Sequence, residues 1–256
     1  MNYWLGKVAV VTGASGGIGL AISKILAAYG IKVIGIARRK DKLMEAVETI
    51  GHYLFYPIEC DITEEDGILR AFKEIEEKFG GVDILVNNAG IFHRSFIIDS
   101  DTQEYLNVVN TNLIAPAVLA REAMNSMRKR DTRGHIINIS GVPGLYLQAV
   151  PVPIGMYGPS KYGLKALGIE LRHEIAVAAL KIKVTTINPG YVQSDMLKEL
   201  YSHLKIPPDG LLKDADIVNA VIYALGTPET VEVCTDKMPN HKTINIVTTL
   251  INHKET

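Results

Sequence analysis

Val8-Ala9-Val10-Val11-Thr12-Gly13-Ala14-Ser15-Gly16-Gly17-Ile18-Gly19 joins a short apolar run to a glycine-rich turn near the amino terminus. The apolar run is typical of a buried strand, and the turn opens a helix-like stretch. In this context Gly13 permits a tight turn, Gly17 lets the backbone approach a pyrophosphate, and Gly19 lets the helix pack on the strand. A helix amino terminus also offers N–H donors and a positive dipole to phosphates. The stretch predicts a dinucleotide site; the alternative is a glycine-rich turn that binds nothing.

Further strand-like runs alternate with amphipathic, helix-like stretches along the chain. These runs are rich in valine and isoleucine and cover residues 7–11, 31–36, 53–58, 83–87, 135–140 and 182–188. Because they are apolar throughout, rather than at every second residue, they indicate a parallel sheet covered on both faces. We find no repeat or linker that divides the chain. We therefore predict an α/β fold, a Rossmann-like doubly wound parallel sheet, as a single domain over residues 1–256.

Two long connections, residues 141–156 and 191–213, carry proline or glycine among apolar side chains. Ligands bind at the carboxyl ends of the strands in such sheets, so we expect both loops to form walls of a substrate site. The apolar side chains expected there are Val142, Leu145, Tyr146, Leu147, Val150, Val152, Ile154, Met156, Tyr191, Met196, Leu197 and Leu200. This lining favours a lipophilic substrate. The alternative is that these residues pack the loops down or bury a subunit contact.

Tyr157-Gly158-Pro159-Ser160-Lys161 places a phenol and an ammonium at positions i and i+4 at the start of a helix-like stretch. At this spacing both side chains lie on one face of a helix. A free tyrosine titrates near pH ~10, and a nearby cation favours the phenolate and lowers that pKa. Tyr157 is therefore a candidate general acid or base at neutral pH, with Lys161 as its partner. Solvated helices without function also carry this spacing.

The composition excludes several classes of protein. With 27 basic and 28 acidic residues, the chain lacks the positive field that holds nucleic acid. Cys60 and Cys234 form no disulfide or metal-ligand pattern, so we expect buried thiols in a reducing compartment. The apolar runs are too short for a membrane span, and the amino terminus shows no secretory signal. We expect a cytosolic protein that acts on a small molecule and uses no metal.

The end of the second strand-like run indicates which nicotinamide dinucleotide binds. An NAD site places Asp or Glu there to accept hydrogen bonds from the ribose hydroxyls, whereas this chain has Ala37-Arg38-Arg39. Arginine binds phosphate through two parallel hydrogen bonds. We therefore predict NADP(H), with Arg38 and Arg39 at the 2′-phosphate; the alternative is two arginines in a solvated loop.

Together these motifs resemble the short-chain dehydrogenase/reductase family over nearly the whole chain. Further segments match: Asp61 resembles the adenine-side aspartate, Asn87-Asn88-Ala89-Gly90 the segment that lines the cofactor after the fourth strand, and Asn112 the helix asparagine that holds a proton-relay water. Pro189-Gly190-Tyr191-Val192-Gln193-Ser194 resembles the segment that meets the nicotinamide, with Ser194 in place of the usual threonine.

The narrower resemblance rests on three stretches. They are Tyr3-Trp4-Leu5-Gly6-Lys7-Val8-Ala9-Val10-Val11-Thr12-Gly13, Ala37-Arg38-Arg39 and Gly134-His135-Ile136-Ile137-Asn138-Ile139. They are similar to the branch of member-11-type ketosteroid reductases and insect farnesol dehydrogenases. The apolar lining expected of the two long loops suits a lipophilic alcohol, isoprenoid or steroid-like, as the substrate.

The resemblance implies hydride transfer between an alcohol and its aldehyde or ketone. Tyr157 would act as general acid or base, Lys161 would lower its pKa and hold the nicotinamide ribose, and Asn112 would order a water that joins Lys161 to solvent. A homodimer or homotetramer is also implied, paired through the helix over about residues 159–180. The cofactor-binding residues expected are Gly13, Ser15, Gly17, Ile18, Gly19, Arg38, Arg39, Asp61, Ile62, Asn88, Ala89, Gly90, Tyr157, Lys161, Pro189, Gly190, Val192 and Ser194.

One position departs from the family pattern. The family ends its fifth strand with a serine that binds the substrate oxygen, and in Ile136-Ile137-Asn138-Ile139-Ser140-Gly141 that position holds Gly141. Neighbouring side chains on a strand point to opposite faces, so Ser140 faces away from the nicotinamide unless a bulge turns it. Two alternatives follow: Ser140 is the catalytic hydroxyl, or the enzyme is slow and Tyr157 alone donates. A second hypothesis for the whole chain is an NADP-binding protein with little or no turnover, in a sensing or structural role.

Overall fold

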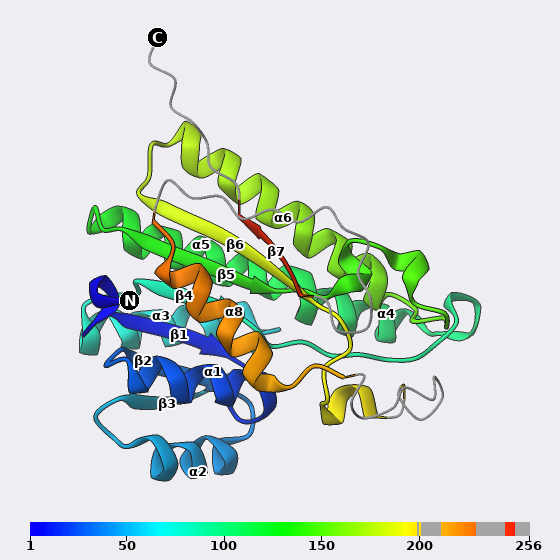
Figure 1. The fold of residues 1–256 in the computed structure, drawn as a ribbon, viewed down its shortest axis with the longest axis horizontal. Coiled ribbons are helices and arrows are strands. Elements are labelled where there is room, and N and C mark those ends of the chain that lie inside the picture. The colour runs from blue at the N-terminus through cyan, green and yellow to red at the C-terminus, as the bar shows by residue number, and fades with distance from the viewer. Residues whose placement is uncertain (199, 201–210, 229–243, 249–256) are drawn as a thin grey trace.

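A seven-stranded sheet with helices on both faces forms the centre of the protein (Figure 1). The computed structural model describes residues 1–198, 200, 211–228 and 244–248. Within them the strand order is β3-β2-β1-β4-β5-β6-β7, and β1 to β6 are parallel. The strands are β1 Val8–Thr12, β2 Lys32–Ala37, β3 Phe55–Glu59, β4 Ile84–Asn87, β5 Gly134–Ile139, β6 Ile182–Pro189 and β7 Ile244–Thr248.

The predicted α/β, doubly wound sheet is confirmed, and all six predicted strands are present. The edge strand β7 was not predicted; it pairs antiparallel with β6, opposing Ile187 with Ile246. An edge strand of five residues has too few positions to show a clear hydrophobic period. The boundary between β1 and β4 marks the point where the chain changes direction across the sheet. Their carboxyl ends therefore form the crevice where such folds bind ligands.

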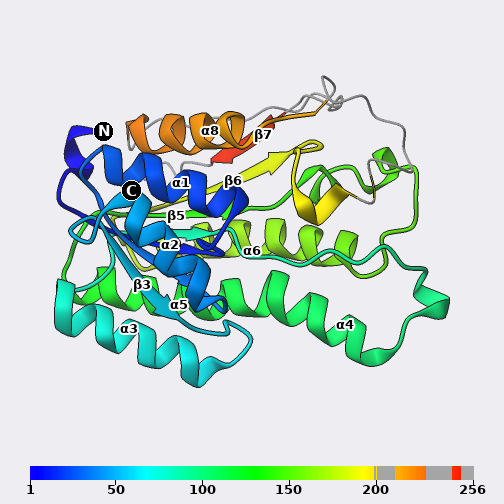
Figure 2. The same cartoon turned by 90° about the horizontal axis from the view of Figure 1, so that it is seen from below.

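The helices divide between the two faces of the sheet (Figure 2). Helices α1, α2 and α8 cover one face, α3, α5 and α6 cover the other, and α4 lies on the same side as α5 and α6, toward the ends of the strands. A single π-helical turn, Asn110–Ile114, joins α4 to α5. The helices are α1 Gly17–Ala28, α2 Lys40–Ile50, α3 Glu65–Phe79, α4 Thr102–Val109, α5 Ala115–Lys129, α6 Tyr157–Val177 and α8 Asp214–Gly226.

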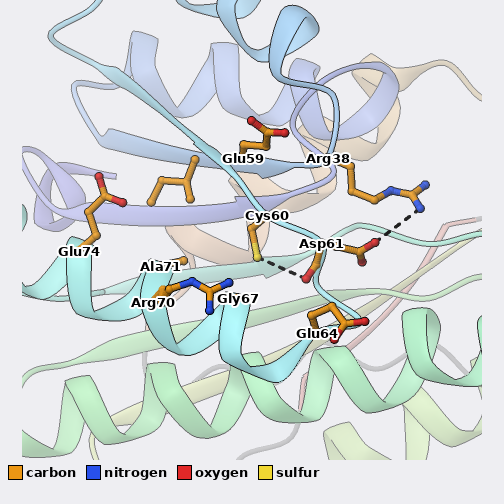
Figure 3. A pocket seen from close by; sticks show the side chains of 10 residues that line it. Arg38, Glu59, Cys60, Asp61, Glu64, Gly67, Arg70, Ala71 and Glu74 are labelled. Atoms are coloured by element: carbon orange, nitrogen blue, oxygen red, sulfur yellow. Dashed lines mark hydrogen bonds and ion pairs between the residues drawn. The ribbon is translucent and has the colours of Figure 1, made fainter.

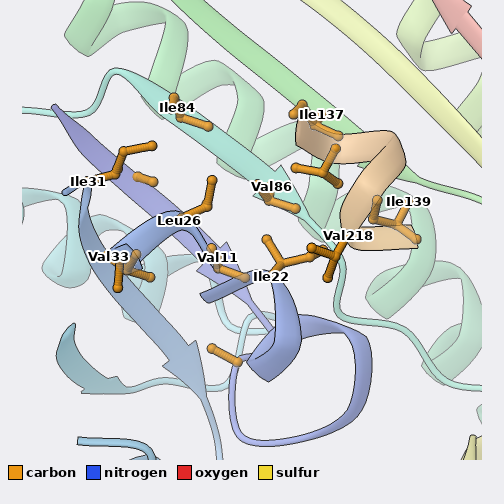
Figure 4. Packing of buried hydrophobic residues seen from close by; sticks show 14 of the residues in the cluster. Val11, Ile22, Leu26, Ile31, Val33, Ile84, Val86, Ile137, Ile139 and Val218 are labelled. Carbon is orange, nitrogen blue, oxygen red and sulfur yellow. The ribbon is translucent and has the colours of Figure 1, made fainter. Parts of the chain in front are cut away.

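Two apolar clusters hold the layers together, one on each face of the sheet. In β1, Ala9 and Val11 enter the cluster under α1, whereas Val8 and Val10 enter the cluster under α3 and α5. Every residue of β1 is buried for this reason, which explains the unbroken apolar run. Figure 4 shows part of the first cluster, with Val11, Ile22, Leu26, Ile31, Val33, Ile84, Val86, Ile137, Ile139 and Val218.

The described residues also bear on membrane and metal binding. None of their helices combines the length and the apolar character that crossing a bilayer requires. Nor do their His, Cys, Asp and Glu side chains gather in threes where a metal ion would bind. Cys60 is a buried free thiol, as expected, whereas Cys234 lies outside the described residues.

Candidate active site

The glycine-rich turn after β1 is packed too closely for side chains. A Cβ at Gly13, where φ is +69°, would stand 2.9 Å from Asn88 Nδ2. At Gly19 it would stand 2.4 Å from the Gly13 carbonyl oxygen. At Gly17, where φ is +50° and α1 begins, no such atom lies within 4 Å. Gly13 and Gly19 thus close the turn, while Gly17 leaves open space at the helix amino terminus.

Thr12 fastens the Asn88-Ala89 segment to this turn. Its Oγ1 accepts hydrogen bonds from the backbone N–H groups of Asn88 and Ala89, both at 3.0 Å. The Asn88 side chain returns one from Nδ2 to the Thr12 carbonyl at 2.9 Å. Sequence reasoning named Asn88 and Ala89 but missed Thr12, which the position at the end of β1 indicates only when the partner segment is known.

Two arginines lie at the end of β2 beside the turn. Arg39 donates to the Ser15 hydroxyl from Nη2 at 3.0 Å and from Nε at 3.3 Å. Arg38 faces Asp61 across 3.9 Å, and its side chain is 70% exposed. Burial raises the pKa of Asp61, but two hydrogen bonds from Thr63 and the Arg38 guanidinium outweigh this effect and leave the pKa below its ordinary value. A hydroxyl and two guanidinium groups therefore surround the mouth of the turn.

A separate surface pocket of about 590 Å3 adjoins this end of the site (Figure 3). Cys60 points toward it from the end of β3, and its thiol donates to the Asp61 carbonyl at 3.4 Å. Burial raises the pKa of the Cys60 thiol, so the thiol stays protonated and unreactive at neutral pH. Arg70, from α3, lines this pocket without lining the main cavity.

Tyr157 and Lys161 come together on the first turns of α6. The Lys161 Nζ lies 5.5 Å from the centre of the Tyr157 ring and donates to the Ile139 carbonyl, at the end of β5, at 3.2 Å. Both side chains are buried. Burial lowers the pKa of Lys161 to about 8. The ammonium is therefore charged at neutral pH and close enough to favour a phenolate.

Asn112 lies in the π-helical turn and is fully buried. Its Oδ1 accepts from the Ile91 N–H and its Nδ2 donates to the Ile91 carbonyl, both at 2.9 Å. Nδ2 also lies 3.1 Å from Ser160 Oγ, which donates to the Tyr157 carbonyl at 2.7 Å. Asn112 therefore ties the segment after β4 to the turn of α6 that carries Tyr157.

Ser140 and Gly141 point in different directions. The Ser140 hydroxyl donates to the Lys161 carbonyl in α6 at 3.2 Å. The Gly141 backbone is extended, and a Cβ there would stand 3.8 Å from the Tyr157 hydroxyl oxygen. Strand alternation thus continues to the end of β5, and the open side of Gly141 faces Tyr157.

One cavity of about 1720 Å3 connects these groups. Seventeen of the eighteen expected cofactor residues line it, all except Gly19, which packs behind Gly13. Asn112 also lies outside the lining, behind Ile91. The expected substrate residues that line it are Val142, Val150, Ile154, Tyr191, Met196, Leu197 and Leu200. The expected residues outside the lining are Leu145, Tyr146, Leu147, Val152 and Met156, and part of the second loop, residues 199 and 201–210, is outside the described residues.

Sequence reasoning missed a third wall of the cavity. Residues of α4 and of the connection that precedes it line the cavity, together with Leu211 and Asp214 near the start of α8. The carboxyl Oδ1 of Asp214 is buried, and burial raises the pKa of this group. The missed residues of the connection and α4 are Ile91, Phe92, His93, Gln103 and Asn107.

A model of the short chain dehydrogenase family matches residues 7–205. The chain belongs to this family. Its sheet is the family's nicotinamide-cofactor fold, and two solved members share it. A short-chain type dehydrogenase/reductase from Mycobacterium marinum matches with a TM-score of 0.80 and 28% identity, over 86% of this chain and 88% of that one. A metagenomic short-chain oxidoreductase solved in complex with NADP matches with a TM-score of 0.73 and 29% identity, over 89% and 94%.

Curated short-chain dehydrogenases confirm the branch that the sequence predicted. A farnesol dehydrogenase from Aedes aegypti is 40% identical over 243 residues, which are 91% of this chain and 95% of the relative. The human dehydrogenase/reductase SDR family member 11 is 34% identical over 247 residues, 91% of this chain and 94% of the relative. One of these relatives is thus named for the oxidation of an alcohol, and the other for dehydrogenase and reductase activity.

We predict that Lys161→Met raises the free energy of unfolding at pH 7 by roughly 1–3 kcal/mol. The reason is that Lys161 has a folded pKa of about 8 against an ordinary value of 10.5. The folded state therefore binds fewer protons than the unfolded state between these two pH values. The buried charge has its full destabilising effect below pH 8, and this effect decreases as the pH rises toward 10.5. Urea unfolding at pH 7 and at pH 10 measures the effect, and the gap between variant and unmodified protein should narrow at pH 10.

The matched control is Lys24→Met, at an exposed lysine of α1, which should leave stability nearly unchanged. A Lys161→Met protein that is less stable than the unmodified protein at pH 7 would contradict this account of the buried ammonium.

Proposed function

We propose that this protein is an NADP-dependent oxidoreductase that interconverts a lipophilic alcohol with its aldehyde or ketone. The observation that carries the proposal is the position of Tyr157 and Lys161, which line the same cavity as the glycine-rich turn. When bound, the nicotinamide accepts hydride from the alcohol or returns it to the carbonyl. The Tyr157 hydroxyl would donate a proton to the carbonyl oxygen in reduction and accept one in oxidation.

Lys161 and Asn112 support this proton transfer in different ways. The Lys161 ammonium favours the phenolate form of Tyr157 because it lies near the ring in a buried site. We propose that it also binds the nicotinamide ribose. Asn112 keeps Ile91 in place and so shapes the wall beside Tyr157. We propose that Asn112 also orders a water that joins Lys161 to solvent.

The residues at the turn fit a dinucleotide with a 2′-phosphate. Gly17 leaves space at the amino terminus of α1. A pyrophosphate there would accept hydrogen bonds from backbone N–H groups, and the helix dipole would favour its negative charge. The Ser15 hydroxyl and the guanidinium groups of Arg38 and Arg39 stand where β2 ends, and that end of β2 has no carboxylate of its own. A structural relative was solved with NADP.

The proposed substrate is lipophilic because of the walls that surround Tyr157. Val150, Ile154, Met196 and Leu200 bring apolar side chains to the cavity. The farnesol dehydrogenase among the relatives supports an isoprenoid alcohol. Assays with NADP+ and NAD+ against terpenoid, steroid and aromatic alcohols, and with NADPH against the matching carbonyls, test the proposal. Turnover of none of them would contradict it.

A second candidate is an NADP-binding protein with little or no turnover. The observation that favours it is Gly141, which offers no hydroxyl at the side that faces Tyr157. Tight NADPH binding together with no turnover in the same panel would support this candidate, in a sensing or structural role.

We also propose a homodimer or homotetramer in the cytosol. Helix α6 exposes Ile169 at 51% and Val177 at 76%, and the π-helical turn exposes Ile114 at 49%. Exposed apolar side chains on surface helices are typical of a subunit contact. Static light scattering at micromolar concentration distinguishes these assemblies from a monomer.

We predict that Arg38→Ala and Arg39→Ala each weaken NADP(H) binding about 10- to 100-fold and leave NAD(H) binding nearly unchanged. Each change removes a charge-assisted contact that only the 2′-phosphate would use. Fluorescence titration with NADPH and NADH measures both affinities. Arg70→Ala is the control, because Arg70 lines the adjoining surface pocket and not the main cavity. Equal affinity of the unmodified protein for both cofactors would contradict the assignment.

We predict that Gly141→Ser raises turnover on a good substrate, at most about 100- to 1000-fold, because it adds a donor beside the reacting oxygen. Gly141→Ala is the control, since it adds the Cβ that meets Pro143 Cδ at 3.3 Å without adding a hydroxyl. Ser140→Ala should change turnover little, because its hydroxyl binds the α6 backbone. Steady-state kinetics measure all three, and a large loss in Ser140→Ala with no gain in Gly141→Ser would identify Ser140 as the catalytic hydroxyl instead.

A further inference from the structure

An aromatic side chain outside the predicted motifs contacts the Tyr157 ring. Phe92 lies in the connection between β4 and α4, and its ring centre is 5.0 Å from that of Tyr157 at an interplanar angle of 84°. This is an edge-to-face pair, a favoured arrangement for aromatic rings. Both residues line the main cavity. Phe92 therefore restricts how the Tyr157 ring can tilt and at the same time faces the space where a substrate would lie.

The same side chain holds the backbone beside Phe92 and the helical turn that carries Tyr157. Asn112 binds both the N–H and the carbonyl of Ile91, the residue before Phe92. The same Asn112 amide contacts Ser160, which binds the Tyr157 carbonyl. One buried amide thus sets the distance between the segment that carries Phe92 and the helical turn that carries Tyr157.

The connection stays close to the other wall of the cavity after Phe92. Ser95 lies against Gly155, where φ is +50° and a Cβ would stand 2.4 Å from Ser95 Oγ. Ser95 Oγ also donates to Glu104 in α4 at 2.5 Å. One residue further, Phe96 turns outward and is 55% exposed. Of the two phenylalanines in the connection, only Phe92 lines the cavity, so Phe96 can serve as a control.

We propose that Phe92 is a positioning and specificity-determining residue of this site. Its ring fixes the orientation of the Tyr157 ring, and it forms the wall against which the apolar part of a bulky alcohol packs. The inference rests on the proposed function and extends it to a residue that none of the sequence motifs contains.

Three variants test the role of Phe92: Phe92→Leu, Phe92→Tyr and the control Phe96→Leu. Phe92→Leu should lower kcat about three- to tenfold, because it removes the edge-to-face contact, and should lower kcat/KM more for bulky than for compact alcohols. The dissociation constant for NADPH should stay unchanged. Phe92→Tyr keeps the ring and should keep kcat near that of the unmodified protein, as should Phe96→Leu.

A second measurement requires no substrate. In protein labelled selectively at tyrosine, the ring signals of Tyr157, assigned with Tyr157→Phe, should shift in Phe92→Leu and not in Phe96→Leu. This result separates the inference from the proposed function: absence of turnover in every variant contradicts the function, whereas unshifted Tyr157 signals overturn the inference. Equal kcat and equal substrate preference in Phe92→Leu and Phe96→Leu also overturn it, as does a loss of NADPH affinity that matches the loss of kcat.

Discussion

The arrangement of this site depends on one buried charge, the ammonium group of Lys161, and on the groups that contact it. Lys161 is 4% exposed, and within the described residues its Nζ donates to the Ile139 carbonyl at the end of β5. No carboxylate of the described residues pairs with Lys161, and burial destabilises its charge, as the lowered pKa of Lys161 indicates. The charge is tolerable only where a carbonyl and the Tyr157 ring both face it. The end of β5 and the first turns of α6 are therefore fixed relative to each other.

The same constraint reaches the cofactor side of the cavity through Gly90. A Cβ at Gly90 would stand 3.7 Å from the Lys161 Nζ and 3.2 Å from Asn112 Oδ1. Glycine at residue 90 therefore lets the segment after β4 pass close to the ammonium without crowding the Asn112 side chain. Thr12 fastens the preceding residues of this segment to the end of β1. Adjacent ends of β1, β4 and β5 thus bring the glycine-rich turn and the proton-transfer residues to one edge of the sheet.

The features that could be predicted from the sequence are those that depend on neighbours in the chain. Prediction of the turn from Gly13 to Gly19 required only the end of one strand, and prediction of the Tyr157–Lys161 pair required only one helical turn. Strands β1 to β6 follow from their unbroken apolar runs. Features that depend on packing between distant segments were not predictable. The approach of Phe92 to Tyr157 depends on Asn112, and the pairing of β7 depends on β6.

At Ser140 and Gly141, the alternation of side chains along a strand predicts where each residue points but not what catalysis requires. Strand alternation predicted that Ser140 and Gly141 point in opposite directions, and the Ser140 hydroxyl does bind the backbone of α6. Whether catalysis needs a hydroxyl beside Tyr157 depends on the position of the substrate oxygen. The pattern of neighbouring residues does not indicate that position. The aromatic wall at Phe92 and the open side of Gly141 together define the space around the Tyr157 hydroxyl.

The most direct test of the central claim is the effect of Tyr157→Phe on turnover and on cofactor affinity, measured in the same preparation. This change removes only the hydroxyl that is proposed to transfer the proton. The account predicts NADPH affinity close to that of the unmodified protein and a loss of most NADP-dependent alcohol oxidation. Retention of most of the activity by the Phe variant would contradict it, because proton transfer would then occur through another group.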